Sequence, residues 1–151
     1  MLRLLPATFG FVMLTVAANT CAAQENAPAE MRMLGQCAGC ILNGNDYREG
    51  RLTGVQLEDS ELTEVSFEEA ALSLAIFDGA RLTNVNFDVS NLRGASFVGA
   101  VLVNVTFDGA DLMGAVFEGA TLDQTDLSTA RLCKTQLPDD MMANDGCNRT
   151  N

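Results

Sequence analysis

The sequence contains no histidine and no tryptophan, and its one tyrosine and eight phenylalanines make up an aromatic content of 6%. This shortage excludes a wide core of aromatic side chains and favours a narrow core of Ala, Val, Leu and Phe. Without histidine, the most common general base and a frequent zinc ligand are missing. The sequence also lacks a glycine-rich phosphate loop and a nucleophile elbow. It therefore predicts a non-enzymatic protein without a cofactor.

Basic residues are scarce. The 151 residues include 9 Lys and Arg against 20 Asp and Glu, which gives a formal charge of −11. Affinity for nucleic acid comes from Lys and Arg that displace counterions, so nucleic acid is excluded as a partner. Attraction to an anionic membrane surface is excluded for the same reason. Such acidity favours solubility and leaves basic proteins or cations as possible partners.

The chain has one long apolar run, Leu4–Ala18, which follows Arg3. It is shorter than the roughly 20 residues that a membrane span needs. Small residues at Thr20–Ala23 then resemble a signal-peptidase site. We predict a cleaved, bacterial-type signal peptide over 1–23 and a periplasmic or secreted protein without a membrane span. Lipidation of Cys21 is the alternative for this segment.

A large apolar residue recurs at every fifth position from Leu42 to Leu137, in twenty units without an insertion. A period of five matches neither a helix nor an ordinary strand, so it indicates a repeating backbone path. A small residue such as Ala70 or Ala80 lies two positions before most of these centres. Four units would complete one square coil of twenty residues, with the central and the small residue pointing inward. Coils of this kind stack on each other and need caps at both ends.

The repeat predicts a specific core. Phe replaces Leu at every second centre from 67 to 117, so the Phe residues should form ladders on two opposite sides of the solenoid. These side chains should fill the interior and leave no pocket. The predicted core ladder comprises Phe67, Phe77, Phe87, Phe97, Phe107, Phe117, Leu72, Leu82, Leu92, Leu102, Leu112 and Leu122.

Individual units match a known consensus. Ala110–Gly114 follows the pattern A-[DN]-L-x-x, and Ala80-Arg81-Leu82 and Ser90-Asn91-Leu92 come close to it. Over about two-thirds of its length the chain thus resembles the pentapeptide-repeat family. The resemblance implies an all-β fold, a right-handed quadrilateral β-helix, here with about five coils. Thr125 and Thr135 depart from the pattern at the small position and predict distortion near the end of the repeat.

The flanking segments also resemble those of exported family members. Cys37–Gly44 is similar to their C-x-G-C lead-in, and Cys133–Cys147 is similar to the tail that follows their last coil. The predicted domains are the signal peptide 1–23, an N-terminal lead and cap 24–39, the β-helix 40–137 and a C-terminal cap 138–151.

Four cysteines remain after the predicted cleavage, and an even number in an exported chain indicates two disulfides. Cys37 and Cys40 form a C-x-x-C motif, for which a redox pair or half of a zinc site is the alternative to a structural disulfide. A redox pair normally works from the start of a helix, and zinc would need two further ligands. Cys133 and Cys147 would close a loop that folds back over the last coil.

Carboxylates crowd the outward positions. Glu68, Asp88 and Asp108 are twenty residues apart and should lie in register on one side, where they would repel each other unless ions or water screen them. Calcium binding is therefore an alternative to a solvated acidic face. The predicted acidic surface comprises Glu58, Asp59, Glu61, Glu64, Glu68, Asp88 and Asp108.

The predicted function is that of an exported scaffold or protein-interaction module, which presents a rigid acidic surface to an unknown protein partner. We expect a monomer or a weak homo-oligomer, because outward Val98, Val101 and Val103 predict a small apolar strip. The family also includes the quinolone-resistance proteins, acidic rods that resemble duplex DNA and bind topoisomerases. A DNA mimic is thus one alternative, although the chain lacks their length and carries an export signal. A calcium-binding or thiol-redox protein is the second.

Overall fold

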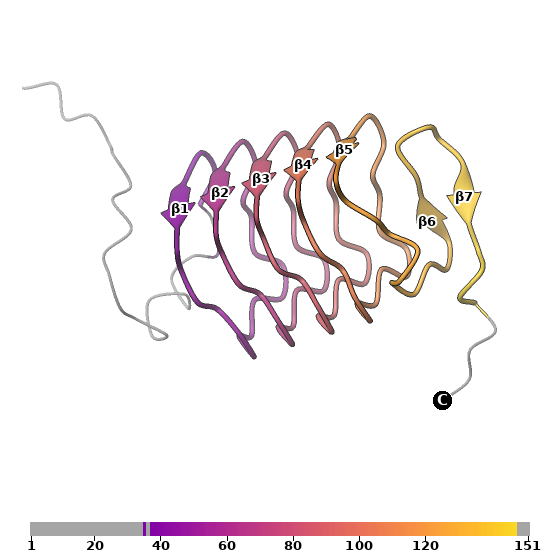
Figure 1. The fold of residues 1–151 in the computed structure, drawn as a ribbon, viewed down its shortest axis with the longest axis horizontal. Helices are drawn as coiled ribbons and strands as arrows, with labels where there is room; N and C mark the ends of the chain where they lie inside the picture. Colours follow the sequence, from indigo (N-terminus) through magenta and orange to yellow (C-terminus); the bar gives the residue numbers. More distant parts are fainter. Residues whose placement is uncertain (1–34, 36, 148–151) are drawn as a thin grey trace, which may run out of the picture.

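The computed structural model describes residue 35 and residues 37–147; the predicted signal peptide and most of the predicted N-terminal lead lie outside this part. Five short strands stack in parallel, and their order in the sheet follows the sequence (Figure 1). The protein is an all-β solenoid, as predicted. The strands are β1 (Ile41–Asn43), β2 (Glu61–Thr63), β3 (Arg81–Thr83), β4 (Val101–Val103) and β5 (Thr121–Asp123).

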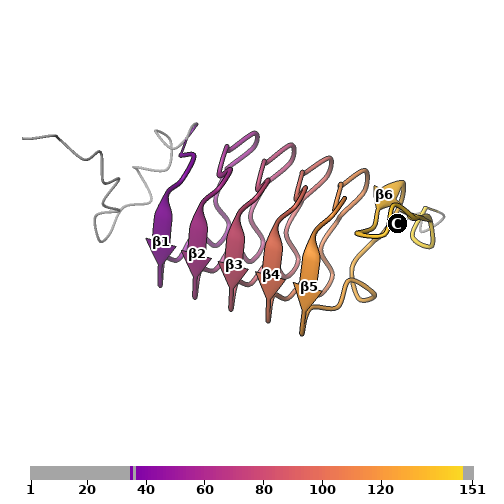
Figure 2. The same cartoon turned by 90° about the horizontal axis from the view of Figure 1, so that it is seen from above.

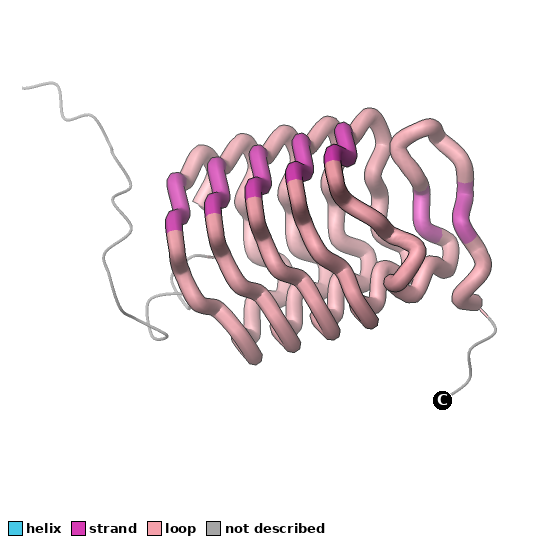
Figure 3. Tube along the Cα trace, viewed as in Figure 1, coloured by secondary structure: helices cyan, strands magenta, loops and turns pink. Residues whose placement is uncertain are grey.

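Each turn of the solenoid takes twenty residues. Leu62 of β2 pairs with Leu42 of β1 and with Leu82 of β3, and the same offset continues to β5. Seen from above, the strands form a single row (Figure 2), and they occupy one side of each turn while loops form the others (Figure 3). Four regular turns thus lie between β1 and β5, and an irregular turn follows them, where about five coils with distortion near the end were predicted.

We name the four sides after a residue at the centre of a repeat unit: the Leu62, Phe67, Leu72 and Phe77 sides, in the order in which the chain follows them. Each side comprises the five-residue units centred at twenty-residue intervals from 42, 47, 52 and 57, respectively. The Leu62 side carries β1 to β5. Isolated parallel bridges, such as that between Ser66 and Asn86, connect the turns on the other sides.

Two ladders of phenylalanine rings fill the interior. Phe67 and Phe87 stack with their centroids 5.2 Å apart, and Phe77 meets Phe67 edge to face at 6.3 Å. Such offset and perpendicular contacts are favourable for aromatic pairs. The six predicted Phe residues are fully buried, and so are the predicted Leu residues except Leu122, which is only partly buried because no regular turn follows it.

The residue two positions after each centre turns the corner, and most of these residues have a left-handed backbone. Glycine occupies many of them, such as Gly109 with a φ of 68°. Val89, the equivalent residue one turn earlier, also has a left-handed backbone, with a φ of 58°. It is 60% exposed. A β-branched residue with such a φ is strained, because its Cβ crowds the backbone. Position 89 is therefore a source of strain in a regular part of the solenoid.

The fifth turn departs from the repeat at Thr125, where the sequence predicts distortion. Its hydroxyl accepts a 3.1 Å hydrogen bond from the Val105 N–H, and the bridges that link Ser66, Asn86 and Thr106 do not extend to Asp126. Thr135, the other predicted irregularity, is fully buried, and its hydroxyl donates a 2.8 Å bond to the Leu112 carbonyl. Thr125 thus coincides with the loss of the regular bridges, whereas Thr135 is accommodated as a buried residue whose hydroxyl is hydrogen-bonded.

Both ends of the described chain are tied to the solenoid. At the N-terminal end, the Ser60 hydroxyl donates to the Cys37 carbonyl at 2.9 Å and accepts from the Cys40 N–H at 3.1 Å. At the C-terminal end, β6 (Thr135–Gln136) and β7 (Met142–Ala143) form a small antiparallel sheet. Across residue 35 and residues 37–147, the structure has no helix long and apolar enough to cross a membrane.

Candidate functional site: a charged circumference and an open end

Charge is distributed unevenly around the solenoid. The units of the Phe67 side carry seven carboxylates and one arginine, a formal charge of −6, and those of the opposite Phe77 side carry −5. The Leu62 side carries −2. The Leu72 side, by contrast, has four basic residues and one carboxylate, which gives +3. A cationic partner therefore meets a favourable field on the Phe sides and an unfavourable one on the Leu72 side.

The column Glu68, Asp88 and Asp108 lies on the Phe67 side in the twenty-residue register of the turns. Asp88 accepts a 2.8 Å hydrogen bond at Oδ1 from the Asp108 N–H, and its own N–H donates to Asn86 Oδ1 at 2.7 Å. The middle carboxylate is thus held in place by the backbone N–H of the next turn. The column can present carboxylates at a fixed spacing to a partner.

The other predicted acidic residues lie elsewhere. Glu58 and Asp59 belong to the Phe77 side, and Glu61 and Glu64 to the Leu62 side. The seven predicted residues therefore do not form one surface, because each turn distributes successive units over four sides. Glu58 also turns one carboxylate oxygen, Oε2, inward, where it is buried and has no hydrogen-bond partner.

Metal ligands do not converge in the described part of the chain. Within residues 35 and 37–147, no three cysteine, Asp or Glu side chains lie close enough together to hold a metal ion. The column on the Phe67 side runs along the solenoid rather than around a point, whereas calcium sites gather six to eight oxygens around one centre.

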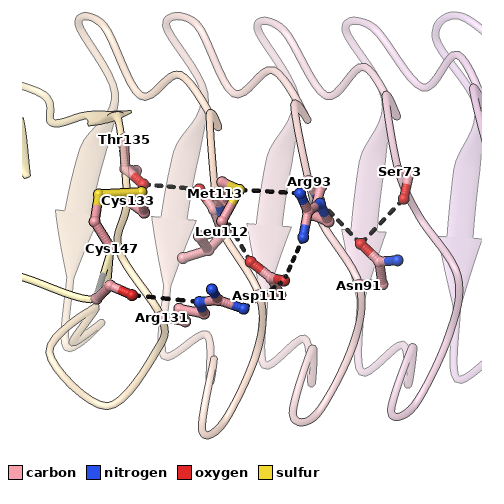
Figure 4. Close-up of polar contacts among 11 residues, drawn as sticks. Ser73, Asn91, Arg93, Asp111, Leu112, Met113, Arg131, Cys133, Thr135 and Cys147 are labelled. Atoms are coloured by element: carbon pink, nitrogen blue, oxygen red, sulfur yellow. Dashed lines mark hydrogen bonds and ion pairs between the residues drawn. A yellow bond between two sulfur atoms is a disulfide. The ribbon is translucent and has the colours of Figure 1, made fainter. Parts of the chain in front are cut away.

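A polar network crosses the turns on the Leu72 side (Figure 4). Arg93 and Arg131 approach the same Asp111 oxygen from the two neighbouring turns, with N···O distances of 3.4 and 3.6 Å. Arg131 also donates from Nε to the Gly146 carbonyl at 3.4 Å, which joins the network to the C-terminal cap. The ion pairs are partly exposed, so each contributes little stability, but together they order the basic groups of this side.

The basic groups of the Leu72 side were missed by the sequence analysis. Arg51, Arg93 and Arg131 each belong to a unit of this side, as does Lys134. The sequence contains this information: when charges are summed over units twenty residues apart, the Leu72 side is positive and the other three sides are negative. Only the total charge was considered, and it hides the difference.

Within the described residues, four cysteines form two disulfides, Cys37–Cys40 and Cys133–Cys147. Cys37 and Cys40 are only 5% and 2% exposed, so reductants have little access to the C-x-x-C pair. Cys133–Cys147 closes the loop that folds over the fifth turn, and the Gly146 N–H donates to the Leu132 carbonyl at 2.7 Å within it. In the described structure these cysteines act as cross-links.

A cavity of about 590 Å³ lies between the fifth turn and the C-terminal cap. The last central residue of each side contributes to it: Leu122, Leu127, Leu132 and Leu137. The sequence predicted a core that is filled by its own side chains and has no internal pocket. This cavity lies beyond the last layer of that core, which no following turn covers.

Four titratable groups of the described residues have shifted pKa values: Asp46, Tyr47, Arg48 and Asp126. Side-chain and backbone hydrogen bonds from Arg48 lower the pKa of Asp46, and the backbone N–H and hydroxyl of Ser128 lower that of Asp126. Burial raises the pKa of Tyr47 at the N-terminal end of the Phe67 ladder. The two aspartates therefore stay ionised to lower pH than an isolated carboxyl group, and both lie on the Phe67 side.

Two of the solved structures that resemble the chain are the following pentapeptide repeat proteins. One is HetL, a pentapeptide repeat protein involved in heterocyst differentiation regulation from the cyanobacterium Nostoc sp. strain PCC 7120. The two chains are 28% identical with a TM-score of 0.60, and the match covers 71% of this chain and 51% of HetL. The chain thus spans about half the length of HetL. The other is a pentapeptide repeat protein from the Arabidopsis thaliana thylakoid lumen, with 25% identity and a TM-score of 0.56 over 80% and 79% of the two chains.

No curated protein matches the chain in sequence. The family profile for pentapeptide repeats, however, matches eight copies over residues 51–88, 82–119, 90–129 and 110–138. These segments cover more than half of the chain and extend from the first turn into the irregular fifth turn. From this match and the four-sided solenoid, we conclude that the protein belongs to the pentapeptide repeat family.

Proposed function

We propose that this protein is a non-enzymatic, exported binding module whose Phe67 side recognises a basic partner protein. The observation that carries the proposal is the segregation of charge: −6 on the Phe67 side against +3 on the Leu72 side. A net charge needed only for solubility would not have to be divided in this way. Electrostatic complementarity of this kind steers association and selects the orientation of the partner.

The rigidity of the acidic column supports the same function. Its carboxylates project from a backbone whose turns are connected by hydrogen bonds, such as that from the Glu69 N–H to the Asp88 carbonyl at 2.9 Å. A rigid array loses little conformational entropy on binding, which favours affinity. The column lies on an outer side of the solenoid, which suits binding to an extended basic surface better than catalysis on a small molecule.

Two features support export. Structural disulfides form and persist in oxidising compartments, and this small chain has two of them. The similar pentapeptide repeat protein of Arabidopsis thaliana comes from the thylakoid lumen, a compartment enclosed by a membrane. The mass of the protein isolated from cell fractions tests this part: a species that begins near Gln24 and has no free thiols before reduction is expected.

A DNA mimic is the weaker alternative. The two Phe sides are both acidic and lie on opposite sides of the solenoid, which favours it. The basic Leu72 side between them argues against it, because duplex DNA has no positive side. A full-length cytoplasmic species with free thiols would support this alternative and contradict export.

Binding of a fluorescent octalysine peptide tests the acidic side. The triple variant Glu68→Gln, Asp88→Asn and Asp108→Asn removes three charges and keeps the oxygen that accepts from the Asp108 N–H. We expect its affinity to fall about tenfold at low salt. The matched control, Glu61→Gln, Glu64→Gln and Asp123→Asn, removes three charges from the Leu62 side. Equal losses in both variants would show that total charge, and not the Phe67 side, is recognised.

A further inference from the structure

The cavity at the C-terminal end has the size and lining of a small-molecule site. Its volume of about 590 Å³ falls within the roughly 300–1,000 Å³ that ligand pockets occupy. Its apolar part consists of the four last central Leu residues, Ala130 and Pro138. Leu122, Leu132 and Leu137 are only partly buried, whereas the central Leu residues of the regular turns are buried. An apolar ligand would cover side chains that are otherwise left in contact with water.

Three carboxylates surround this apolar surface. Asp126 comes from the fifth turn, and Asp139 and Asp145 come from the C-terminal cap; all three side chains are exposed to solvent. No Lys or Arg contributes to the lining of the cavity. Because hydrogen bonds from Ser128 lower the pKa of Asp126, at least this carboxylate is ionised at any moderately acidic or neutral pH. The entrance is therefore negative and the interior apolar.

We propose that the cavity binds a small organic ammonium compound with a compact apolar body. The apolar part would lie against the four leucines, and the ammonium group would face the carboxylates of Asp126, Asp139 and Asp145. An anionic amphiphile such as a fatty acid would bring its head group to the same carboxylates and be repelled. This site lies at the end of the solenoid, and it does not depend on the proposed role of the Phe67 column.

Residues 148–151 would make a poor occupant. The residues that follow Cys147 are Asn148, Arg149, Thr150 and Asn151, and none of them has a large apolar side chain. They can supply a cation but cannot cover the leucines. A second copy would bring a surface that is acidic on three of its four sides toward an acidic entrance, which is unfavourable.

Three probes share the same apolar adamantane cage and differ in charge: 1-aminoadamantane is a cation, 1-adamantanol is neutral and adamantane-1-carboxylate is an anion. Comparing them separates the effect of charge on binding from that of the apolar contact. Each is titrated into the full-length protein while the methyl NMR signals of the four leucines are followed. We expect 1-aminoadamantane to bind about tenfold more tightly than the alcohol, because the carboxylates of the lining attract its ammonium group. The carboxylate should bind more weakly than the alcohol, and added salt should reduce the difference between the probes.

Two sets of variants locate the site. The double variant Asp139→Asn and Asp145→Asn should weaken binding of the ammonium probe severalfold and leave binding of the alcohol unchanged. The control Asp88→Asn, on the Phe67 side, should change the binding of neither probe. Ala130→Phe should fill the cavity and abolish binding of both probes, whereas Ala71→Phe, at an outward position, should have no effect. If Ala130→Phe fails to fold, the aspartate variants still decide the outcome, because they alter exposed side chains.

Three results would overturn the proposal. Equal affinity for the three probes would show an apolar end without charge selectivity, and methyl shifts away from the four leucines would place binding elsewhere. Tighter binding of the ammonium probe to Arg149→Gln would show that the chain's own tail occupies the site. Shifts that depend on protein concentration and not on the probe would make a second copy the occupant.

Discussion

The Oδ1 atom of Asp88 lies 2.8 Å from the backbone nitrogen of Asp108, and accepts a hydrogen bond from it. Two residues of like charge thus face each other across successive turns, but the contact between them is attractive. A carboxylate that accepts a backbone N–H is stabilised in its charged form. The repulsion expected along the Phe67 side is therefore reduced by the backbone of the next turn.

The two aspartates should differ in their effect on stability. Asp88→Ala removes the acceptor of the Asp108 N–H and should lower the free energy of unfolding by about 1 kcal/mol. Asp108→Ala removes an exposed carboxylate and should change it by less than about 0.5 kcal/mol. Urea unfolding measures both values, and Asp88→Asn, which keeps an acceptor, should resemble the native protein. A larger loss from Asp108→Ala would contradict the observed geometry.

Phe97 tests the distinction between inward and outward positions. Its ring is fully buried and stacks on Phe77 and Phe117 at 4.9 and 4.8 Å. Phe97→Asp buries an unpaired carboxylate and leaves a void, a cost comparable to the total stability of about 5–15 kcal/mol of a typical domain. We expect this variant to lack a cooperative thermal transition in calorimetry.

The neighbouring Val98→Asp is the matched control, because its side chain points outward and is 36% exposed. It should melt within a few degrees of the native protein. Equal melting of the two variants would show that residues 97 and 98 are not on opposite faces of the solenoid wall.

Val89→Asn should stabilise the protein. Asn tolerates the left-handed backbone that Val89 adopts, and the equivalent corners on the Leu62 side already use Asn84 and Asn104. We expect a gain of about 1 kcal/mol in the free energy of unfolding, measured with urea. Val98→Asn, the same change at an exposed position without positive φ, should give no gain. Destabilisation by Val89→Asn would mean that packing of Val89 against the corner of the next turn outweighs the strain.

The two disulfides should contribute unequally. Cys133–Cys147 closes a loop with a sequence separation of 14, and Cys37–Cys40 one of 3. Loop entropy gives about 3 kcal/mol for the longer loop and about 2 kcal/mol for the shorter one, in a model-dependent treatment. Calorimetry of Cys133→Ala with Cys147→Ala should therefore show a lower melting temperature than that of Cys37→Ala with Cys40→Ala. The reverse order would indicate that the N-terminal cap limits stability.

Asp126 should respond to acid through Ser128. The backbone N–H and then the hydroxyl of Ser128 hold the pKa of Asp126 below its ordinary value of 3.8. A lowered pKa in the folded state contributes stability above the unfolded value, and this contribution is lost as the pH falls from about 3.8 through the folded pKa. Ser128→Ala keeps the backbone bond and removes the hydroxyl, so the pKa should rise part of the way toward 3.8. An NMR titration of the Asp126 carboxyl carbon measures it, and an unchanged pKa would contradict the role of the hydroxyl.

Much of the fold follows from the sequence alone. The five-residue period with alternating Phe and Leu centres predicts that residues twenty apart meet, and Leu62 does pair with Leu42 and Leu82. It also predicts that the rings of Phe67 and Phe87 stack, since one repeated backbone path places equivalent side chains one above the other. Such local and periodic information needs no knowledge of distant packing.

The ends of the solenoid were decided by the tertiary structure. The repeat already assigns Glu58 and Glu61 to different sides because they belong to neighbouring units, whereas the hydrogen bond from the Asp108 N–H to Asp88 is seen only in the folded turns. The cavity beside Leu132 depends on how the cap packs against a last layer that no turn covers. A repeat specifies the contacts between its own copies, whereas the end of the repeat is shaped by a segment that has no equivalent within it.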